Sequence, residues 1–561
     1  MSDKIPHAFN YYNGGKITVE KYDDGRDYFD PHGMHIAGIL AGNDTEQDIK
    51  NFNGIDGIAP NAQIFSYKMY SDAGSGFAGD ETMFHAIEDS IKHNVDVVSV
   101  SSGFTGTGLV GEKYWQAIRA LRKAGIPMVV ATGNYATSAS SSSWDLVANN
   151  HLKMTDTGNV TRTAAHEDAI AVASAKNQTV EFDKVNIGGE SFKYRNIGAF
   201  FDKNKITTNE DGTKAPSKLK FVYIGKGQDQ DLIGLDLRGK IAVMDRIYTK
   251  DLKNAFKKAM DKGARAIMVV NTVNYYNRDN WTELPAMGYE ADEGTKSQVF
   301  SISGDDGVKL WNMINPNKKT EVKRNNKEDF KDKLEQYYPI DMESFNSNKP
   351  NVGDEKEIDF KFAPDTDKEL YKEDIIVPAG STSWGPRIDL LLKPDVSAPG
   401  KNIKSTLNVI NGKSTYGYMS GTSMATPIVA ASTVLIRPKL KEMLERPVLK
   451  NLTGDDKIDL TSLTKIALQN TARPMMDATS WKEKSQYFAS PRQQGAGLIN
   501  VANALRNEVV ATFKNTDSKG LVNSYGSISL KEIKGDKKYF TIKLHNTSNR
   551  PLTFKVSASA I

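Results

Sequence analysis

The chain has 561 residues, enough for several structural units with a large core, and its 73 lysines and arginines nearly balance its 69 aspartates and glutamates. A formal net charge of +4 on a chain of this size points to neither nucleic acid nor a membrane surface as the partner. The absence of cysteine excludes disulfides, thiol catalysis and thiolate-ligated zinc, and no run of 18 apolar residues could span a bilayer.

The first segment with chemistry is Asp30–Leu40, in which small residues alternate with apolar ones. This pattern predicts a tightly packed, buried helix. It carries two histidines, His32 and His35, which could ligate a metal, supply a proton acceptor at the mouth of the helix, or be ordinary core residues. A metal site is the weakest of these interpretations, because the segment lacks the glutamate and the four-residue spacing of zinc peptidases.

The next hundred residues alternate between strand-like and helix-like segments. Strands are expected at 62–69, 96–101 and 126–132, and helices at 81–93 and 113–124. This order predicts a parallel sheet with right-handed crossovers, in which ligand sites lie beyond the carboxyl ends of the strands. Asn134 follows the last of these strands, where its amide is either a turn former or a donor to an oxyanion.

The segment Met419–Pro427 is a run of small residues with Ser423 at its centre. The apolar stretch at 428–431 predicts the start of a helix, with Pro427 in its first turn. A serine hydroxyl at this point lies beside unpaired backbone N–H groups and the positive end of the helix dipole, which suit a developing oxyanion. Taken alone, the segment is better explained by serine and threonine acting as helix caps.

Three motifs occur in an order that resembles the subtilisin-like serine proteases, the subtilases. They are His32–Gly38 (HGMHIAG), Ala131–Asn134 (ATGN) and Gly421–Pro427 (GTSMATP). Within this family the resemblance covers nearly the whole chain and is to the Gram-positive cell-envelope proteinases of the lactocepin and C5a-peptidase type. It implies an α/β fold with a subtilisin-like parallel sheet flanked by helices.

The resemblance also implies roles for the residues of these motifs. Ser423 corresponds to the nucleophile, His32 to the general base and Asn134 to the side-chain donor of the oxyanion hole. His35 is expected to be structural, because the first histidine of the motif is the family's catalytic one. The segment in which the family lines its specificity pocket corresponds to Ser101, Ser102 and Gly103.

Far more residues separate Asn134 from Ser423 than a bare catalytic domain requires. Part of the excess is a β-α-β pattern between 234 and 271, which resembles the protease-associated domain inserted in envelope subtilases. A second insert, from about 315 to 372, is highly charged and poor in apolar residues, and its segment 325–335 is interpreted as mostly a solvated helix or loop.

Alternating stretches near the end of the chain, at 539–544 and 552–556, resemble the start of a fibronectin-type β domain. Too few strands for a sandwich follow, and no sorting motif or wall-spanning region is present, so the protein is expected to extend beyond Ile561. The expected organisation is a catalytic domain in two parts with an insert and a C-terminal β domain: 1–180, 181–375, 376–508 and 509–561.

The sequence departs from the subtilase pattern at the triad aspartate, which orients the histidine. The pair Asp23 and Asp24 follows an apolar stretch but lies too close to His32 for the strand, loop and helix that belong between them, and neither Asp3, Asp27 nor Asp30 has a preceding apolar strand. We therefore expect the aspartate to come from a separate N-terminal fragment of the same precursor, as the resemblance to chemokine-cleaving streptococcal members implies.

Two functions from different classes remain. The first is a serine endopeptidase acting on extracellular proteins, host chemokines among them, from a secreted or wall-attached precursor, although the polar start of the chain shows no signal peptide. The second is an inactive binding or adhesin-like module on a protease scaffold. Intact His32, Asn134 and Ser423 favour the enzyme. Its chemistry needs no cofactor, and scattered Asp and Asn residues are compatible with structural calcium without forming an EF-hand loop.

Overall fold

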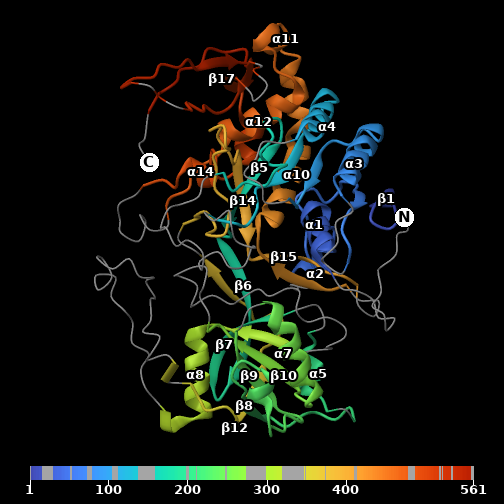
Figure 1. Cartoon of the computed structure of the whole chain (residues 1–561), viewed down its shortest axis with the longest axis vertical. Coiled ribbons are helices and arrows are strands. Elements are labelled where there is room, and N and C mark those ends of the chain that lie inside the picture. Colours follow the sequence, from blue (N-terminus) through green and yellow to red (C-terminus); the bar gives the residue numbers. More distant parts are fainter. Residues whose placement is uncertain are drawn as a thin grey trace.

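The computed structural model describes residues 2–15, 30–50, 54–72, 79–103, 111–136, 158–197, 201–209, 211–246, 249–272, 298–318, 346–347, 349–372, 375–409, 414–477, 487–516, 520, 522–531, 533 and 535–557. They form a main body, built from both ends of the chain, and a smaller body built from residues 179–372, which we call the insert (Figure 1).

Four parallel strands form the central sheet of the main body, in the order β14-β5-β4-β3. They are β3 (Val98–Val100), β4 (Met128–Ala131), β5 (Ile170–Lys176) and β14 (Val396–Lys401). All of β4 and nearly all of β5 are buried, because a parallel sheet is covered by helices on both faces. The parallel sheet predicted from the sequence is confirmed for the strands expected at 96–101 and 126–132, whereas the strand expected at 62–69 lies in a separate sheet.

Five helices of the described chain cover this sheet: α1 (His32–Ala41), α3 (Asp80–Lys92), α4 (Glu112–Lys123), α10 (Thr422–Leu444) and α12 (Leu460–Thr471). The side chain of Val129 in β4 packs on the α10 side, together with α12. Its neighbours Met128 and Val130 pack against α3 and α4 on the opposite face. This alternation gives a three-layer α/β/α arrangement with the sheet in the middle and α10 in one of the two outer layers (Figure 1).

Two further parallel strands, β1 (His7–Asn10) and β2 (Phe65–Lys68), form a separate sheet beside the central one. Among the described strands, β2 and β3 each lie at an edge of their own sheet. A cavity of about 460 Å³ lies between them, lined by residues of β2 and β3 and by α1, α3 and α10. The two parallel sheets are therefore separated by a space that both edge strands face.

The insert is built on an eight-stranded sheet in the order β12-β8-β9-β10-β11-β7-β6-β13, which closes because β12 also pairs with β6. The strands are β6 (Thr179–Ile187), β7 (Glu190–Ile197), β8 (Lys218–Tyr223), β9 (Ile241–Asp245), β10 (Ala266–Val270), β11 (Val299–Ile302), β12 (Glu355–Phe362) and β13 (Glu369–Lys372). Its helices include α7 (Thr249–Asp261) and α8 (Gly304–Ile314). The β-α-β unit predicted between 234 and 271 is confirmed by the parallel pair β9 and β10.

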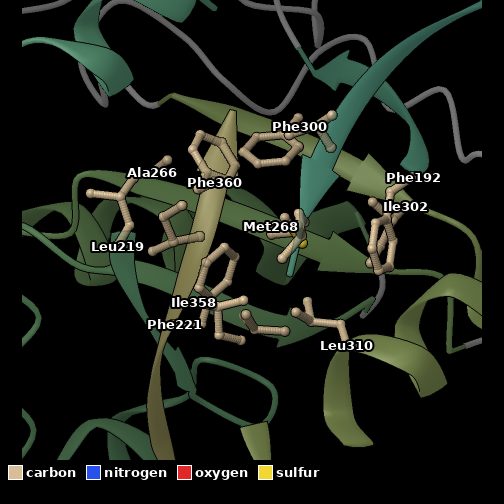
Figure 2. Packing of buried hydrophobic residues seen from close by; sticks show 14 of the residues in the cluster. Phe192, Leu219, Phe221, Ala266, Met268, Phe300, Ile302, Leu310, Ile358 and Phe360 are labelled. Atoms are coloured by element: carbon tan, nitrogen blue, oxygen red, sulfur yellow. The ribbon is translucent and has the colours of Figure 1, made fainter. Parts of the chain in front are cut away.

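The charged stretch at 315–372, predicted as a second insert, differs from the structure in its last part, whereas the segment 325–335 interpreted as solvated lies outside the described residues. Strand β12 belongs to the same closed sheet, where Ile358, Phe360 and Phe362 alternate inward between exposed charged residues. Figure 2 shows two of these side chains, Ile358 and Phe360, packed with Phe221 and Phe300 in the core of the insert. Only one face of this strand is buried, so the charged side chains between these three positions remain in solvent. Burial of the three apolar side chains therefore stabilises the strand without burying charge.

The end of the described chain forms a three-stranded antiparallel sheet of β17 (Val509–Thr516), β18 (Val522–Tyr525) and β19 (Lys543–Asn546). Of the two strands expected here, the first is only partly realised as β19. The second, at 552–556, is described without a strand, and Val556 is 86% exposed. An apolar alternating stretch needs a neighbouring strand to pair with, and the described chain provides none at this position.

The remaining elements are short. They are α2 (Glu46–Lys50), α5 (Lys203–Thr207), α6 (Asp229–Leu232), α11 (Pro447–Lys450), α14 (Pro491–Gln494), α15 (Val501–Arg506) and the antiparallel hairpin of β15 (Ile403–Thr406) and β16 (Tyr416–Met419). In the described part of the chain, no helix combines the length and the apolar character needed to cross a membrane.

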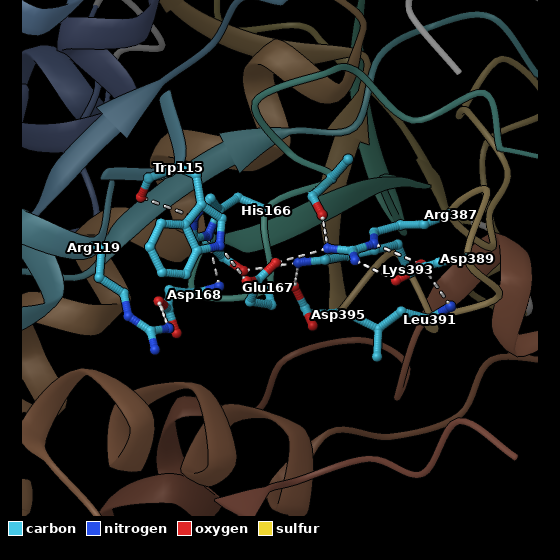
Figure 3. Close-up of polar contacts among 12 residues, drawn as sticks. Trp115, Arg119, His166, Glu167, Asp168, Arg387, Asp389, Leu391, Lys393 and Asp395 are labelled. Carbon is cyan, nitrogen blue, oxygen red and sulfur yellow. Dashed lines mark hydrogen bonds and ion pairs between the residues drawn. The ribbon is translucent and has the colours of Figure 1, made fainter. Parts of the chain in front are cut away.

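A buried network of charged side chains joins the start of β14 to the segment before β5 (Figure 3). Arg387 donates to Glu167 at 2.9 Å, and Lys393 donates to Asp395 at 2.7 Å and to the carbonyl of Ala169 at 2.9 Å. Burial lowers the pKa of Lys393 to about 7. Burial alone would raise the pKa of Asp395, but the neighbouring ammonium groups hold it below its usual value. The network fixes β14 beside β5, and β14 leads toward Ser423.

Candidate active site

Ser423 is the second residue of α10, and its contacts depend on Pro427, which lies four residues further along the helix. Pro427 has no N–H to give to the carbonyl of Ser423. That carbonyl instead accepts a hydrogen bond from the hydroxyl of Ser101 at 2.8 Å, and the Ser423 hydroxyl donates to the Ser101 carbonyl at 3.0 Å. The helix begins at Thr422, earlier than predicted, so Ser423 lies in its first turn against the loop that follows β3.

The side chain of Asn134 lies at the same helix start. Its Oδ1 accepts the N–H of Thr422 at 2.9 Å and the hydroxyl of Thr422 at 3.2 Å. Because a backbone N–H can only donate, this contact fixes which side of the amide carries the oxygen. A Cβ on Gly421 would lie 3.1 Å from Nδ2, so glycine leaves room for the amide donor beside Ser423. Asn134 therefore presents a positioned N–H₂ group at the start of α10.

Thr422 is a residue of the site that the sequence analysis did not single out. Its hydroxyl accepts the N–H of Gly133 at 3.1 Å and donates to Asn134. This one side chain ties the carboxyl end of β4 to the start of α10, across 289 positions of sequence. Thr422 is part of the GTS motif, so its role in the site could have been suspected from sequence. A threonine at a helix start, however, is usually only a helix cap.

His32 is the first residue of α1, and its backbone N–H donates to Asp30 Oδ1 at 2.9 Å. Burial lowers the pKa of His32 and the nearby Asp30 carboxylate opposes this, so the imidazole is neutral at pH 7 and able to accept a proton. Ile39 of α1 packs on Met424 of α10, so the helices that carry His32 and Ser423 are direct neighbours. The Ser423 hydroxyl has one proton, which it gives to Ser101 in this conformation.

His35, the second histidine of the motif, is a core residue, as the sequence analysis expected. It is completely buried, and its Nε2 lies 3.0 Å from the carbonyl of Ile403 and 3.2 Å from the carbonyl of Gly417. Two carbonyl acceptors require that Nε2 carries the proton. His35 therefore holds α1 against the hairpin β15–β16.

Buried neutral histidines should make the protein less stable in mildly acidic solution. Burial lowers the pKa of His35 to about 4, and that of the buried His166 also to about 4. Between these values and the ordinary pKa of about 6.5, the unfolded chain binds protons that the folded chain does not, so the free energy of unfolding falls as the pH falls. Urea unfolding near pH 5 should show a loss on the order of 2 kcal/mol for each histidine relative to pH 7.5.

The control for this prediction is His35→Gln, whose amide can donate to the same carbonyls but does not titrate. It should reduce the difference between the two pH values by about half. An equal pH dependence in both proteins would show that His35 is not the source.

The segment Ser101–Gly103 approaches the site from the end of β3. Ser101 contacts Ser423 directly, and Gly103 lies so close to Thr161 that a Cβ would come within 2.6 Å of its Cβ. Glycine is thus needed for this packing. The assignment of Ser101, Ser102 and Gly103 to a specificity pocket remains a prediction.

No carboxylate of the described residues accepts a hydrogen bond from the ring of His32. Asp30 accepts the backbone N–H instead. Asp23, Asp24 and Asp27 lie outside the described residues. Within the described ranges there is likewise no group of three or more His, Asp or Glu side chains placed to hold a metal ion.

A serine and an amide at one helix start of a parallel α/β sheet, with a histidine on the neighbouring helix, are the kinds of group that acyl-transfer hydrolases use. The chain belongs to the subtilase family, peptidase S8, whose sequence profile matches residues 1–497. Subtilases are serine peptidases with a subtilisin-like α/β fold. The family expected from the three sequence motifs is confirmed.

The chain is similar to two groups of bacterial proteinases. It is 29% identical to the PII-type proteinase of Lactococcus lactis subsp. cremoris over 576 residues, which cover 100% of this chain and 26% of the relative. It is 25% identical to the C5a peptidase of Streptococcus pyogenes serotype M18 (strain MGAS8232), over 98% of this chain and 39% of the relative. The chain thus spans about a quarter to two fifths of the length of these relatives.

Among solved structures, the chain is similar to a psychrophilic subtilisin-like protease from the Antarctic bacterium Pseudoalteromonas sp. AS-11. The match has a TM-score of 0.36 and 15% identity, and covers 85% of this chain and 83% of that chain. A likeness at this level adds nothing to the family assignment.

Proposed function

We propose that the chain is the serine-bearing part of an endopeptidase that hydrolyses peptide bonds of extracellular proteins through an acyl-enzyme. The observation that carries the proposal is the placement of Asn134 and Ser423 at the same helix start, joined through Thr422. A scaffold that only bound a partner would need no such arrangement of an amide donor next to a half-buried hydroxyl.

The proposed mechanism assigns one task to each side chain. His32, neutral at pH 7, takes the proton of Ser423 as the hydroxyl oxygen attacks the peptide carbonyl, and returns it to the leaving amine. Asn134 Nδ2 and the backbone N–H of Ser423 hold the tetrahedral oxyanion, aided by the start of α10. The Ser423 hydroxyl must first leave the Ser101 carbonyl and turn toward His32.

We infer further that the triad carboxylate arrives with a β-strand that enters between β2 and β3. The cavity of about 460 Å³ lies between the two edge strands, and both sheets are parallel. A parallel strand added there would end at the same edge as β3, whose end contacts Ser423 through Ser101. Leu40 and Ala41 of α1 line this cavity, so the added strand would lie against the helix that begins at His32.

The family resemblance supports proposals for the source of this strand and for the substrate. We propose a separate N-terminal fragment of the same precursor as the source, and a secreted or wall-attached location for the whole proteinase. The name of one relative, C5a peptidase, indicates that this relative cleaves C5a. For this chain we propose extracellular protein substrates, host chemokines among them. We also propose that the insert is a protease-associated domain and that 509–561 begins a fibronectin-type domain.

The experiment that tests the proposed function is labelling of Ser423 with a fluorophosphonate probe, with and without an added fragment that bears the aspartate strand. Rapid labelling that depends on the fragment supports the split triad. Absence of labelling under both conditions favours the alternative, an inactive binding module on a subtilase scaffold.

Replacing Asn134 should slow the chemical step and leave substrate binding almost unchanged. Its amide bonds the oxyanion, which develops only in the transition state, so Asn134→Ala should lower kcat about 10²–10³-fold, as loss of such a donor does in subtilisin. Steady-state kinetics on one peptide should show this loss in kcat with little change in KM. A change in KM alone would identify Asn134 as a substrate-binding or turn residue.

A further inference from the structure

Two strands of the insert contact the hairpin β15–β16, which leads directly to the nucleophile. Strand β16 ends at Met419, shortly before Ser423. Its residue Tyr418 donates its hydroxyl proton to the carbonyl of Glu181 in β6 at 3.1 Å and packs on Phe182 of the same strand. The insert is therefore in contact with the segment that carries the catalytic serine.

The second strand of the insert in contact with this region is β7, through Arg195. Arg195 is 2% exposed, and its guanidinium donates from Nη1 to Asn402 Oδ1 at 2.7 Å. The same group lies 4.5 Å from the ring centroid of Tyr418 and 5.2 Å from that of Phe182, as cation–π contacts. A buried charge held by aromatic rings and a short hydrogen bond has little freedom to move.

Asn402 in turn holds the residues that precede the nucleophile. It has a φ of 59°, a left-handed conformation that asparagine tolerates better than most residues. Its backbone N–H donates to the Ser420 hydroxyl at 2.9 Å, and the N–H of Gly421 donates to the Gly400 carbonyl at 2.7 Å. Residues 400–402 thus fix the Ser420–Gly421 turn from one side, and Asn134 fixes Thr422 from the other.

We propose that Arg195 is a positioning residue for the nucleophile. By holding the Asn402 side chain, it fixes the turn at Ser420 and with it the orientation of Ser423 relative to the Asn134 amide. The proposal rests on the proposed function, and it extends it: the insert supports the geometry of the chemical step, in addition to any role in admitting substrate.

Arg195→Ala in the complete proteinase, including its aspartate-bearing segment, should lower kcat about tenfold, the effect of one charge-assisted hydrogen bond. KM for a short peptide should be unchanged, because a buried side chain does not touch substrate. The matched control is Arg265→Ala. Arg265 also lies in the insert and donates to the carbonyls of Ile206 and Thr208 at 3.0 and 3.2 Å, remote from the hairpin. This variant should lower the melting temperature of the insert and leave kcat as it is.

Two further variants separate positioning from a general loss of stability. Asn402→Gly keeps the left-handed backbone and removes the acceptor, so it should lower kcat as Arg195→Ala does, and the double variant should lose no more than either alone. Arg195→Lys keeps a cation near the Tyr418 ring but ends short of the Asn402 amide. Arg195→Lys should therefore show the same fall in kcat as expected for Arg195→Ala. It serves as the test if Arg195→Ala does not fold.

A full kcat in Arg195→Lys, equal losses in Arg195→Ala and Arg265→Ala, or additive losses in the double variant would each overturn the proposal. The proposed function fails by a different result, namely turnover that survives Ser423→Ala in the otherwise unaltered proteinase.

Discussion

Ser423→Ala should reduce peptide hydrolysis by the complete proteinase about 10⁶-fold in kcat, the scale seen when the catalytic serine of subtilisin is removed. The reason is that no other hydroxyl of the site lies in the first turn of α10 beside the Asn134 amide, apart from that of Thr422, which is engaged with Gly133 and Asn134. The turnover of a fluorogenic peptide, measured after removal of contaminating protease, checks this prediction.

The fold should survive this change, because the Ser423 side chain makes a single hydrogen bond, to the carbonyl of Ser101. Loss of one such bond lowers the free energy of unfolding by about 1 kcal/mol. Thermal melting should therefore be nearly unchanged. Retained activity in Ser423→Ala contradicts the assignment of Ser423 as the nucleophile. If Ser423→Ala does not fold, Ser423→Cys should be measured in its place, because it retains the size of the side chain.

Much of the main body could be predicted from sequence because its signals are local. The buried strand β4 is a continuous apolar run, and the glycines and alanines of α1 indicate close packing. The positions of Asn134 and Ser423 followed from motifs at strand and helix ends. The partners of these residues could not be predicted in the same way, because the bonds from Thr422 to Gly133 and from Ser101 to Ser423 join segments far apart in sequence.

The insert and the C-terminal sheet show where local signals mislead. Strand β12 carries charged residues on its exposed face, and their number hides the inward alternation of Ile358, Phe360 and Phe362. At 552–556 the alternation is clear, yet no strand forms in the described chain, since pairing depends on a neighbour that sequence alone does not supply. The contact of Arg195 with Asn402 depends on how the insert meets the main body, which no motif encodes.

The chain of residues 1–561 by itself should be nearly inactive, and a fragment that carries the aspartate strand should restore it. No carboxylate of the described residues accepts a hydrogen bond from the ring of His32. If the chain supplies none, the ring is free to adopt the wrong tautomer, which in a serine protease costs about 10⁴ in kcat. The added strand should also raise stability, because among the described residues the facing edges of β2 and β3 have no strand paired to them across a cavity of about 460 Å³.

Mixing the two polypeptides should therefore raise both kcat and the melting temperature. The informative control is the same fragment with its single motif aspartate changed to alanine. It can still add a strand between β2 and β3, so it should restore the melting temperature, but it gives His32 no carboxylate and should leave kcat about 10⁴-fold lower. If the isolated chain is instead fully active, the third member of the triad is an aspartate within it. Replacement of Asp23 or Asp24 by alanine would then identify that residue. The strand between β2 and β3 would in that case have to come from this chain.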